Sequence, residues 1–194
     1  MTDRQHHRPM TPGGMFFEAL VGGADPALVS EAADRAAVLF VRGARDSGDA
    51  EVADRLLRLA ETEGIETIAE VWSGSPADSL AGCLWRLYLL RSWVYADPAG
   101  VAAEFEAGLG SVQVARVVAG VAEPPGPDQL KAMVDEVLRG IAGSDFADVL
   151  FRAAAFARVV AAGRAVTGGE VQRMLQLSEQ LEAAGHLELD HGLA

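Results

Sequence analysis

The sequence predicts an all-α protein, a bundle of about eight to ten helices around a central apolar helix at residues 76–96. Half of the 194 residues are hydrophobic, which is enough to form a buried core. A side-chain acceptor precedes proline at Asp25-Pro26, Ser75-Pro76 and Asp97-Pro98, a pairing that is typical of helix starts. Strand-like alternation of apolar and polar residues is nearly absent, and residues 186–190 are the one candidate.

The elements follow from helical spacing and from the prolines and glycines that interrupt it. Residues 1–14 are polar and contain two prolines, so we expect a flexible N-terminal arm. Capping-box spacing of Ser75 with Asp78, and of Thr167 with Glu170, marks two further helix starts. The predicted helices cover residues 15–21, 26–45, 49–63, 65–73, 76–96, 98–108, 111–122, 127–142, 145–165 and 168–184.

A proline-rich linker at residues 123–127 is the clearest interruption of the helical pattern, because proline blocks helix continuation. We expect a single helical domain over residues 15–190. The alternative is two lobes, residues 15–122 and 127–190, joined by this linker. The second stretch is too short to bury a large core alone, so we expect it to pack on the first.

Charge and composition restrict the location and the partners of the protein. The net charge is −12, which disfavours nucleic acid and anionic membrane surfaces as partners. No segment supplies the ~20 apolar residues of a membrane span. Cys83 is the one cysteine, so no intramolecular disulfide can form, which fits the cytoplasm. All basic residues except Lys131 are arginine, a bias typical of a GC-rich genome, and we expect a bacterial source.

The central segment 76–96 carries two neighbouring stripes of apolar side chains at helical spacing, so it is expected to be buried on several sides. Arg86 and Arg91 interrupt it and, being five residues apart, point in different directions. The first stripe is Leu80, Leu84, Leu87, Tyr88 and Tyr95, and the second is Trp85, Leu89, Trp93 and Ala96.

These aromatic residues and arginines form the candidate ligand site, a pocket beside the segment 76–96 in which an arginine holds an acidic group. Its residues are Trp72, Trp85, Arg86, Tyr88, Arg91 and Trp93. The alternative interpretation is structural: the aromatic rings belong to the core, and the arginines reach solvent or pair with carboxylates of the acidic stretches. In the same way, Arg152, Arg158 and Arg164 are interpreted as a solvated helix face.

Motifs for catalysis, metal binding or a cofactor do not stand out. The sequence has no phosphate-binding glycine loop, and it lacks a second cysteine. His186, Glu188, Asp190 and His191 have side chains of the metal-binding type, but we interpret them as an exposed polar terminus. We therefore predict no catalytic residue, metal or cofactor. An enzymatic activity is left open but is not favoured.

Acidic residues concentrate in two stretches, residues 49–79 and 167–194. They favour a non-enzymatic, soluble helical protein that acts through protein–protein interaction or self-association by an acidic surface. The alternative function is a small-molecule sensor or carrier that uses the aromatic pocket beside residues 76–96. The expected partners are thus another protein or a second copy of the chain, or else a small molecule.

Overall fold

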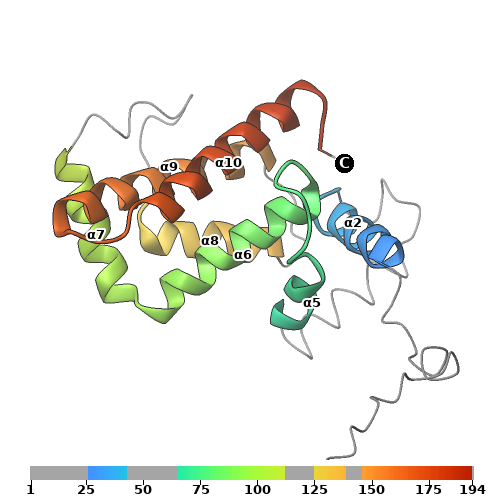
Figure 1. The fold of residues 1–194 in the computed structure, drawn as a ribbon, viewed down its shortest axis with the longest axis horizontal. Helices are drawn as coiled ribbons and strands as arrows, with labels where there is room; N and C mark the ends of the chain where they lie inside the picture. Colours follow the sequence, from blue (N-terminus) through green and yellow to red (C-terminus); the bar gives the residue numbers. More distant parts are fainter. Residues whose placement is uncertain (1–25, 43–64, 112–124, 139–145, 194) are drawn as a thin grey trace, which may run out of the picture.

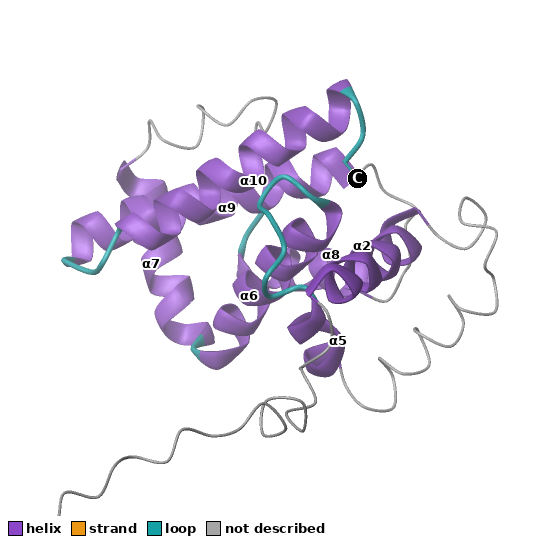
Figure 2. Cartoon of the chain, turned by 45° about the vertical axis from the view of Figure 1, so that its right-hand side comes forward, coloured by secondary structure: helices purple, strands orange, loops and turns teal. Residues whose placement is uncertain are grey.

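The computed structural model describes residues 26–42, 65–111, 125–138 and 146–193, and in these ranges the chain is helical without strands (Figure 2). The all-α prediction is confirmed. The described helices are α2 (Pro26–Arg42), α5 (Ile65–Val71), α6 (Leu80–Ala96), α7 (Pro98–Ser111), α8 (Pro127–Leu138), α9 (Phe146–Thr167) and α10 (Gln172–Asp190).

The predicted number of helices is not confirmed. Seven helices lie in the described ranges, against the eight to ten expected for the whole chain. The expected arm 1–14 and the expected helices 15–21 and 49–63 lie outside the described residues, as does nearly all of 111–122.

All three proline-headed starts can be compared with the structure, and the one at Pro26 is confirmed, because α2 begins there. At Asp97-Pro98 the prediction is confirmed, because α7 begins at Pro98 and Asp97 Oδ1 accepts a hydrogen bond of 2.9 Å from the backbone N–H of Gly100. At Ser75-Pro76 it is wrong, because α6 begins only at Leu80. The cap is Ser79, whose Oγ accepts from the backbone N–H of Gly82 at 3.1 Å.

The turn before α6 explains this later start. Residues 72–79 fold as successive turns, in which the N–H of Ser75 donates to the carbonyl of Trp72 and that of Ser79 to the carbonyl of Pro76. The turn lies so close to the first turn of α6 that a Cβ on Gly82 would sit 1.6 Å from the Pro76 carbonyl oxygen. Glycine at position 82 therefore permits the chain to fold back over the start of the helix.

The C-terminal helix α10 differs from the predicted helix 168–184, because it begins at Gln172 and ends at Asp190. Thr167, predicted to mark its start, belongs to the helix before it. Helix α9 continues to Thr167 and is followed by Gly168, whose φ of +79° lies in the left-handed region that favours glycine. The candidate strand at residues 186–190 is wrong, because α10 continues to Asp190. No strand lies in the described residues to pair with this segment, and continuing the helix gives its backbone groups intrahelical partners.

Helix α9 is the most extensively buried helix of the described chain, and it packs on α7 and α10. Glycines allow α7 to approach it closely: a Cβ on Gly108 would lie 1.9 Å from the carbonyl oxygen of Val159, and one on Gly163 would lie 1.7 Å from that of Glu104. The two backbones are therefore in direct contact. Figure 1 shows α9 and α10 lying along each other, with α7 beside one end of α9.

Helix α6 contacts each of the other six described helices. Leu80, Leu84 and Leu87 of its first stripe are buried, whereas Tyr95 is exposed. Helices from residues 65–111 and from 127–190 pack directly against each other, since α6 contacts α8, α9 and α10. Trp85, Tyr88 and Trp93 of α6 are only partly buried, so part of this helix reaches the surface.

Candidate functional site

A groove of about 540 Å³ lies between α6 and α10. The two helices run in opposite directions, and the Nε of Arg86 on α6 donates a hydrogen bond of 2.8 Å to Oε1 of Gln180 on α10 (Figure 1). The groove is lined by Trp85, Arg86, Leu89, Leu90 and Trp93 of α6, by Arg164 of α9, and by Arg173, Met174, Gln176, Leu177 and Gln180 of α10. Its volume is within the range typical of small-molecule sites.

Arg86 lies at one end of the groove. Its Nη1 donates to the carbonyl of Gly82 at 2.8 Å, and its Nε donates to the amide oxygen of Gln180. Both acceptors are neutral, so they orient the guanidinium without neutralising it. Trp85 is adjacent, and its ring stacks on that of Tyr88 with centroids 5.6 Å apart.

Trp93, Arg164 and Arg173 line the opposite end. The guanidinium of Arg164 lies over the Trp93 ring, 4.7 Å from its centroid, and Arg164 Nε donates to a carboxylate oxygen of Glu104 at 2.9 Å. The charge of Arg164 is therefore balanced. Arg173 is exposed, and its backbone N–H donates to Oε1 of Glu170 at 3.2 Å, while its side chain lines the groove.

The two ends differ from the rest of the described molecule in their charge balance. Most basic side chains of the described ranges form ion pairs, namely Arg42, Arg91, Lys131, Arg152, Arg158 and Arg164. Arg86 and Arg173 form none with any carboxylate of the described ranges. No carboxylate is among the residues that line the groove. A positively charged groove has therefore formed in a chain of net charge −12.

The structure brings three of the six predicted site residues together: Trp85, Arg86 and Trp93 line the groove. Trp72 is elsewhere. It is fully buried, its Nε1 donates to the carbonyl of Ala33 at 3.2 Å, and its ring packs edge-on against Phe40. Trp72 therefore belongs to the packing of α2 against the turn before α6, and the expected grouping of all three tryptophans does not occur.

Tyr88 and Arg91 are not among the groove-lining residues either. Tyr88 reaches the groove only indirectly, through its stacking on Trp85. Arg91 forms an ion pair with Asp135 of α8, and its guanidinium lies over the ring of Tyr95. Arg91 is thus engaged in an ion pair, as the structural interpretation expects of an arginine, but its carboxylate partner comes from α8 and not from an acidic stretch.

Sequence reasoning missed the half of the groove that α9 and α10 supply. Arg164 and Arg158 are not a solvated face, because Arg164 pairs with Glu104, and Arg158 pairs with Glu182 at 2.7 Å. A signal for α10 was present: Arg173, Leu177 and Gln180 recur at the spacing of one helical face. That spacing does not reveal which helix the face meets.

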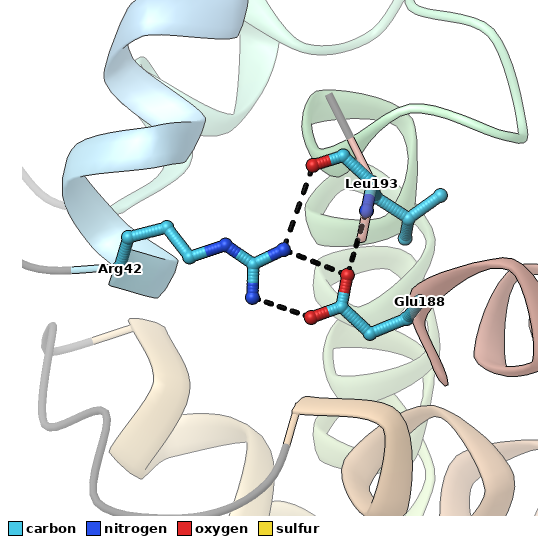
Figure 3. A network of polar contacts seen from close by, with 3 residues as sticks. All are labelled: Arg42, Glu188 and Leu193. Atoms are coloured by element: carbon cyan, nitrogen blue, oxygen red, sulfur yellow. Dashed lines mark hydrogen bonds and ion pairs between the residues drawn. The ribbon is translucent and has the colours of Figure 1, made fainter. Parts of the chain in front are cut away.

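A second polar cluster joins the C-terminal residues to α2 (Figure 3). The guanidinium of Arg42 binds both carboxylate oxygens of Glu188, and Glu188 Oε2 also accepts from the backbone N–H of Leu193 at 2.8 Å. Partial burial acts to raise the pKa of Glu188. The hydrogen bonds from Arg42 and Leu193 outweigh it, and the pKa is lowered from its ordinary value. This carboxylate is a structural ion pair and not part of an exposed terminus.

The remaining reactive candidates in the described ranges are inert or dispersed. Burial raises the pKa of the Cys83 thiol to about 12, so the thiolate is scarcely populated at neutral pH. Within the described residues, His, Cys, Asp and Glu form no group able to hold a metal ion.

Comparison of the chain with family models, with curated proteins and with solved structures gives no match. None of the helices described here has the length and apolar character needed to cross a membrane.

Proposed function

We propose that this protein binds a small anionic molecule with an apolar body in the groove between α6 and α10. One observation supports the proposal above others. The groove combines aromatic and aliphatic walls with two guanidinium groups, those of Arg86 and Arg173, that no described carboxylate neutralises.

The walls and the guanidiniums would make different contributions to binding. Contact with Trp85, Leu89 and Trp93 removes apolar ligand surface from water and so provides affinity. The arginines would select a negative charge, because charge-assisted hydrogen bonds to guanidinium are stronger than neutral ones. The negative charge of the rest of the protein opposes this only weakly, since charges beyond a Debye length of about 8 Å are screened at physiological salt.

Protein–protein interaction through an acidic surface stays a prediction and ranks second. Two carboxylates of the stretch 167–194 are engaged within the molecule: Glu182 pairs with Arg158, and Glu188 pairs with Arg42. Fewer negative charges of this stretch are therefore available to a partner. Most of the other stretch, residues 49–79, lies outside the described residues.

Titration of the full chain with decanoate and with decanol, followed by tryptophan fluorescence, tests the proposal. The two probes share a chain length and differ in charge. We expect decanoate to perturb Trp85 and Trp93 and to bind about tenfold more tightly than decanol. Trp72 is buried in the core and should contribute a constant background.

The double variant Arg86→Gln/Arg173→Gln should bind decanoate no better than decanol. Arg152→Gln is the matched control, because Arg152 lies on α9 away from the groove and should leave decanoate affinity unchanged. The proposal fails if neither probe binds below its aggregation concentration, if both bind equally, or if the double variant binds decanoate like the parent protein.

A further inference from the structure

Resting on the proposed function, we infer that the ligand carries a carboxylate at each end, so that it spans the groove from Arg86 to Arg173 as an extended dicarboxylate with an apolar chain between. The inference follows from where the two unneutralised guanidiniums lie, not only from their number.

The register of α10 against α6 sets the distance between the guanidinium groups of Arg86 and Arg173. Gln180 contacts Arg86 directly, at 2.8 Å between Gln180 Oε1 and Arg86 Nε. Arg173 lies seven residues earlier on α10, which is almost two full helical turns, so it shares a face with Gln180. Seven residues advance a helix by roughly 10 Å. The two positive charges therefore stand at opposite ends of one groove.

Helix α6 shows the same seven-residue spacing. Arg86 and Trp93 share a face of α6, and Trp93 together with Arg164 marks the end at which Arg173 lies. Because the two helices run in opposite directions, seven residues forward on α6 and seven residues back on α10 lead to the same end of the groove. Arg86 thus marks one cationic end, and Arg173 marks the other. A ligand lying along it would run parallel to both helices.

The middle of the groove is apolar. Leu89 and Leu90 of α6 face Met174 and Leu177 of α10 between the two ends. Gln176 supplies a neutral amide to the lining. A charge in the centre of a bound ligand would lose water without gaining an ionic partner, which is costly. The groove therefore fits a chain with its charges confined to the termini.

Carboxylate fits the ends better than phosphate. Each end offers one unneutralised guanidinium, since the charge of Arg164 is already balanced by Glu104. One guanidinium matches the single charge of a carboxylate, to which its paired N–H groups can bind side by side. A phosphate monoester carries about −1.5 to −2 charges at pH 7 and would remain partly uncompensated at either end.

Isothermal titration of the full chain with decanedioate, decanoate and hexanedioate tests the inference. An extended ten-carbon chain spans roughly 10 Å, taking about 3.5 Å for every three bonds. Decanedioate should therefore reach both arginines, whereas hexanedioate is too short. We expect decanedioate to bind about tenfold more tightly than decanoate, and hexanedioate to bind more weakly than either.

Single variants give the decisive pattern. Arg86→Gln and Arg173→Gln should each lower decanedioate affinity about tenfold. Each should lower decanoate affinity only about twofold, because a monoacid can bind in the reverse orientation at the remaining arginine. Arg152→Gln should change neither value.

The outcomes separate the two levels of the proposal. Equal affinities for decanoate and decanedioate, or single variants that weaken both probes alike, would overturn the two-ended ligand and leave the anion-binding groove standing. No binding of any of the three acids would overturn both.

Discussion

Helix α10 contributes to two regions of very different packing. Against α9 it is closely packed: Gly185 lies so near Phe151 that an added Cβ would come within 2.8 Å of the ring, and Ser178 is buried at the same contact. Toward α6 it lines a groove in which Arg86 and Gln180 make a direct polar contact. The same helix is thus part of the core on one side and of a candidate site on the other.

The difference arises from side-chain size and polarity. Small residues on α9, such as Ala154 and Gly163, let neighbouring backbones approach, and close-packed atoms gain dispersion energy. On the α6 side, the large side chains of Trp85 and Trp93 line the groove, and the polar Gln180 of α10 bonds to Arg86 of α6. We infer that the α7–α9–α10 contacts hold the fold, while the α6–α10 groove is free to serve binding. The following predictions test this division.

The largest effect on the free energy of unfolding is expected where α7 meets α9. Gly108→Ala would place a Cβ 1.9 Å from the carbonyl oxygen of Val159, and the two backbones would have to separate. We expect a loss of about 3 kcal/mol in the free energy of unfolding. Gly110→Ala is a matched control in the same helix, because a Cβ there meets nothing within 4 Å. It should raise stability by about 0.5–1 kcal/mol.

Urea denaturation followed by circular dichroism measures both variants. The close approach of α7 and α9 would be contradicted if Gly108→Ala and Gly110→Ala had the same midpoint.

A smaller effect on the free energy of unfolding is expected at the contact between α9 and α10. The Oγ of Ser178 donates to the carbonyl of Ala154 at 2.9 Å and accepts from Nε of Arg158 at 3.2 Å, in a side chain with no exposed surface. Ser178→Ala should cost about 1–2 kcal/mol, because Arg158 loses an acceptor. Glu179→Ala, at an exposed neighbouring position, should stay within about 0.5 kcal/mol of the parent. Equal denaturation midpoints for the two variants would argue against a structural role for Ser178.

At its C-terminal end, α10 is held to α2 by an ion pair in place of close packing, and this attachment should depend on pH. The pKa of Glu188 is lowered in the folded protein, so its ionised form stabilises the fold above the ordinary carboxyl pKa. This contribution is lost as the pH falls through the folded-state pKa. Glu188→Gln should therefore cost about 1 kcal/mol at pH 7, and the difference from the parent should shrink in acid.

Thermal unfolding of both proteins between pH 7 and pH 3 measures this difference. A constant gap across the range would show that the charge of Glu188 is not what matters. Glu179→Gln serves as the control, since Glu179 is exposed and forms no ion pair with the described residues.

Much of the fold followed from local signals, whereas the complete site did not. The cap at Asp97 and the stripe Trp85–Leu89–Trp93 depend on neighbours along the chain, and the structure uses both. Helix α6 begins at Leu80 and not at Pro76, because residues 72–79 fold as successive turns that lie against Gly82, and the Ser75-Pro76 pair alone does not reveal those turns. Arg164 and Arg173 became site residues only because α9 and α10 meet α6, a pairing that periodicity within one helix does not encode.

The smallest effect on stability is expected within the groove itself. Leu89 is 43 % exposed, so Leu89→Gln removes little buried surface and should change the free energy of unfolding by less than about 0.5 kcal/mol. Leu87, two residues earlier on α6, has no exposed surface, and Leu87→Ala should cost about 2–5 kcal/mol. Leu89→Gln should instead weaken binding of decanedioate, because it replaces apolar wall with an amide. If Leu89→Gln were as destabilising as Leu87→Ala, the groove would be part of the core, and the division between a packed region and a binding region would be wrong.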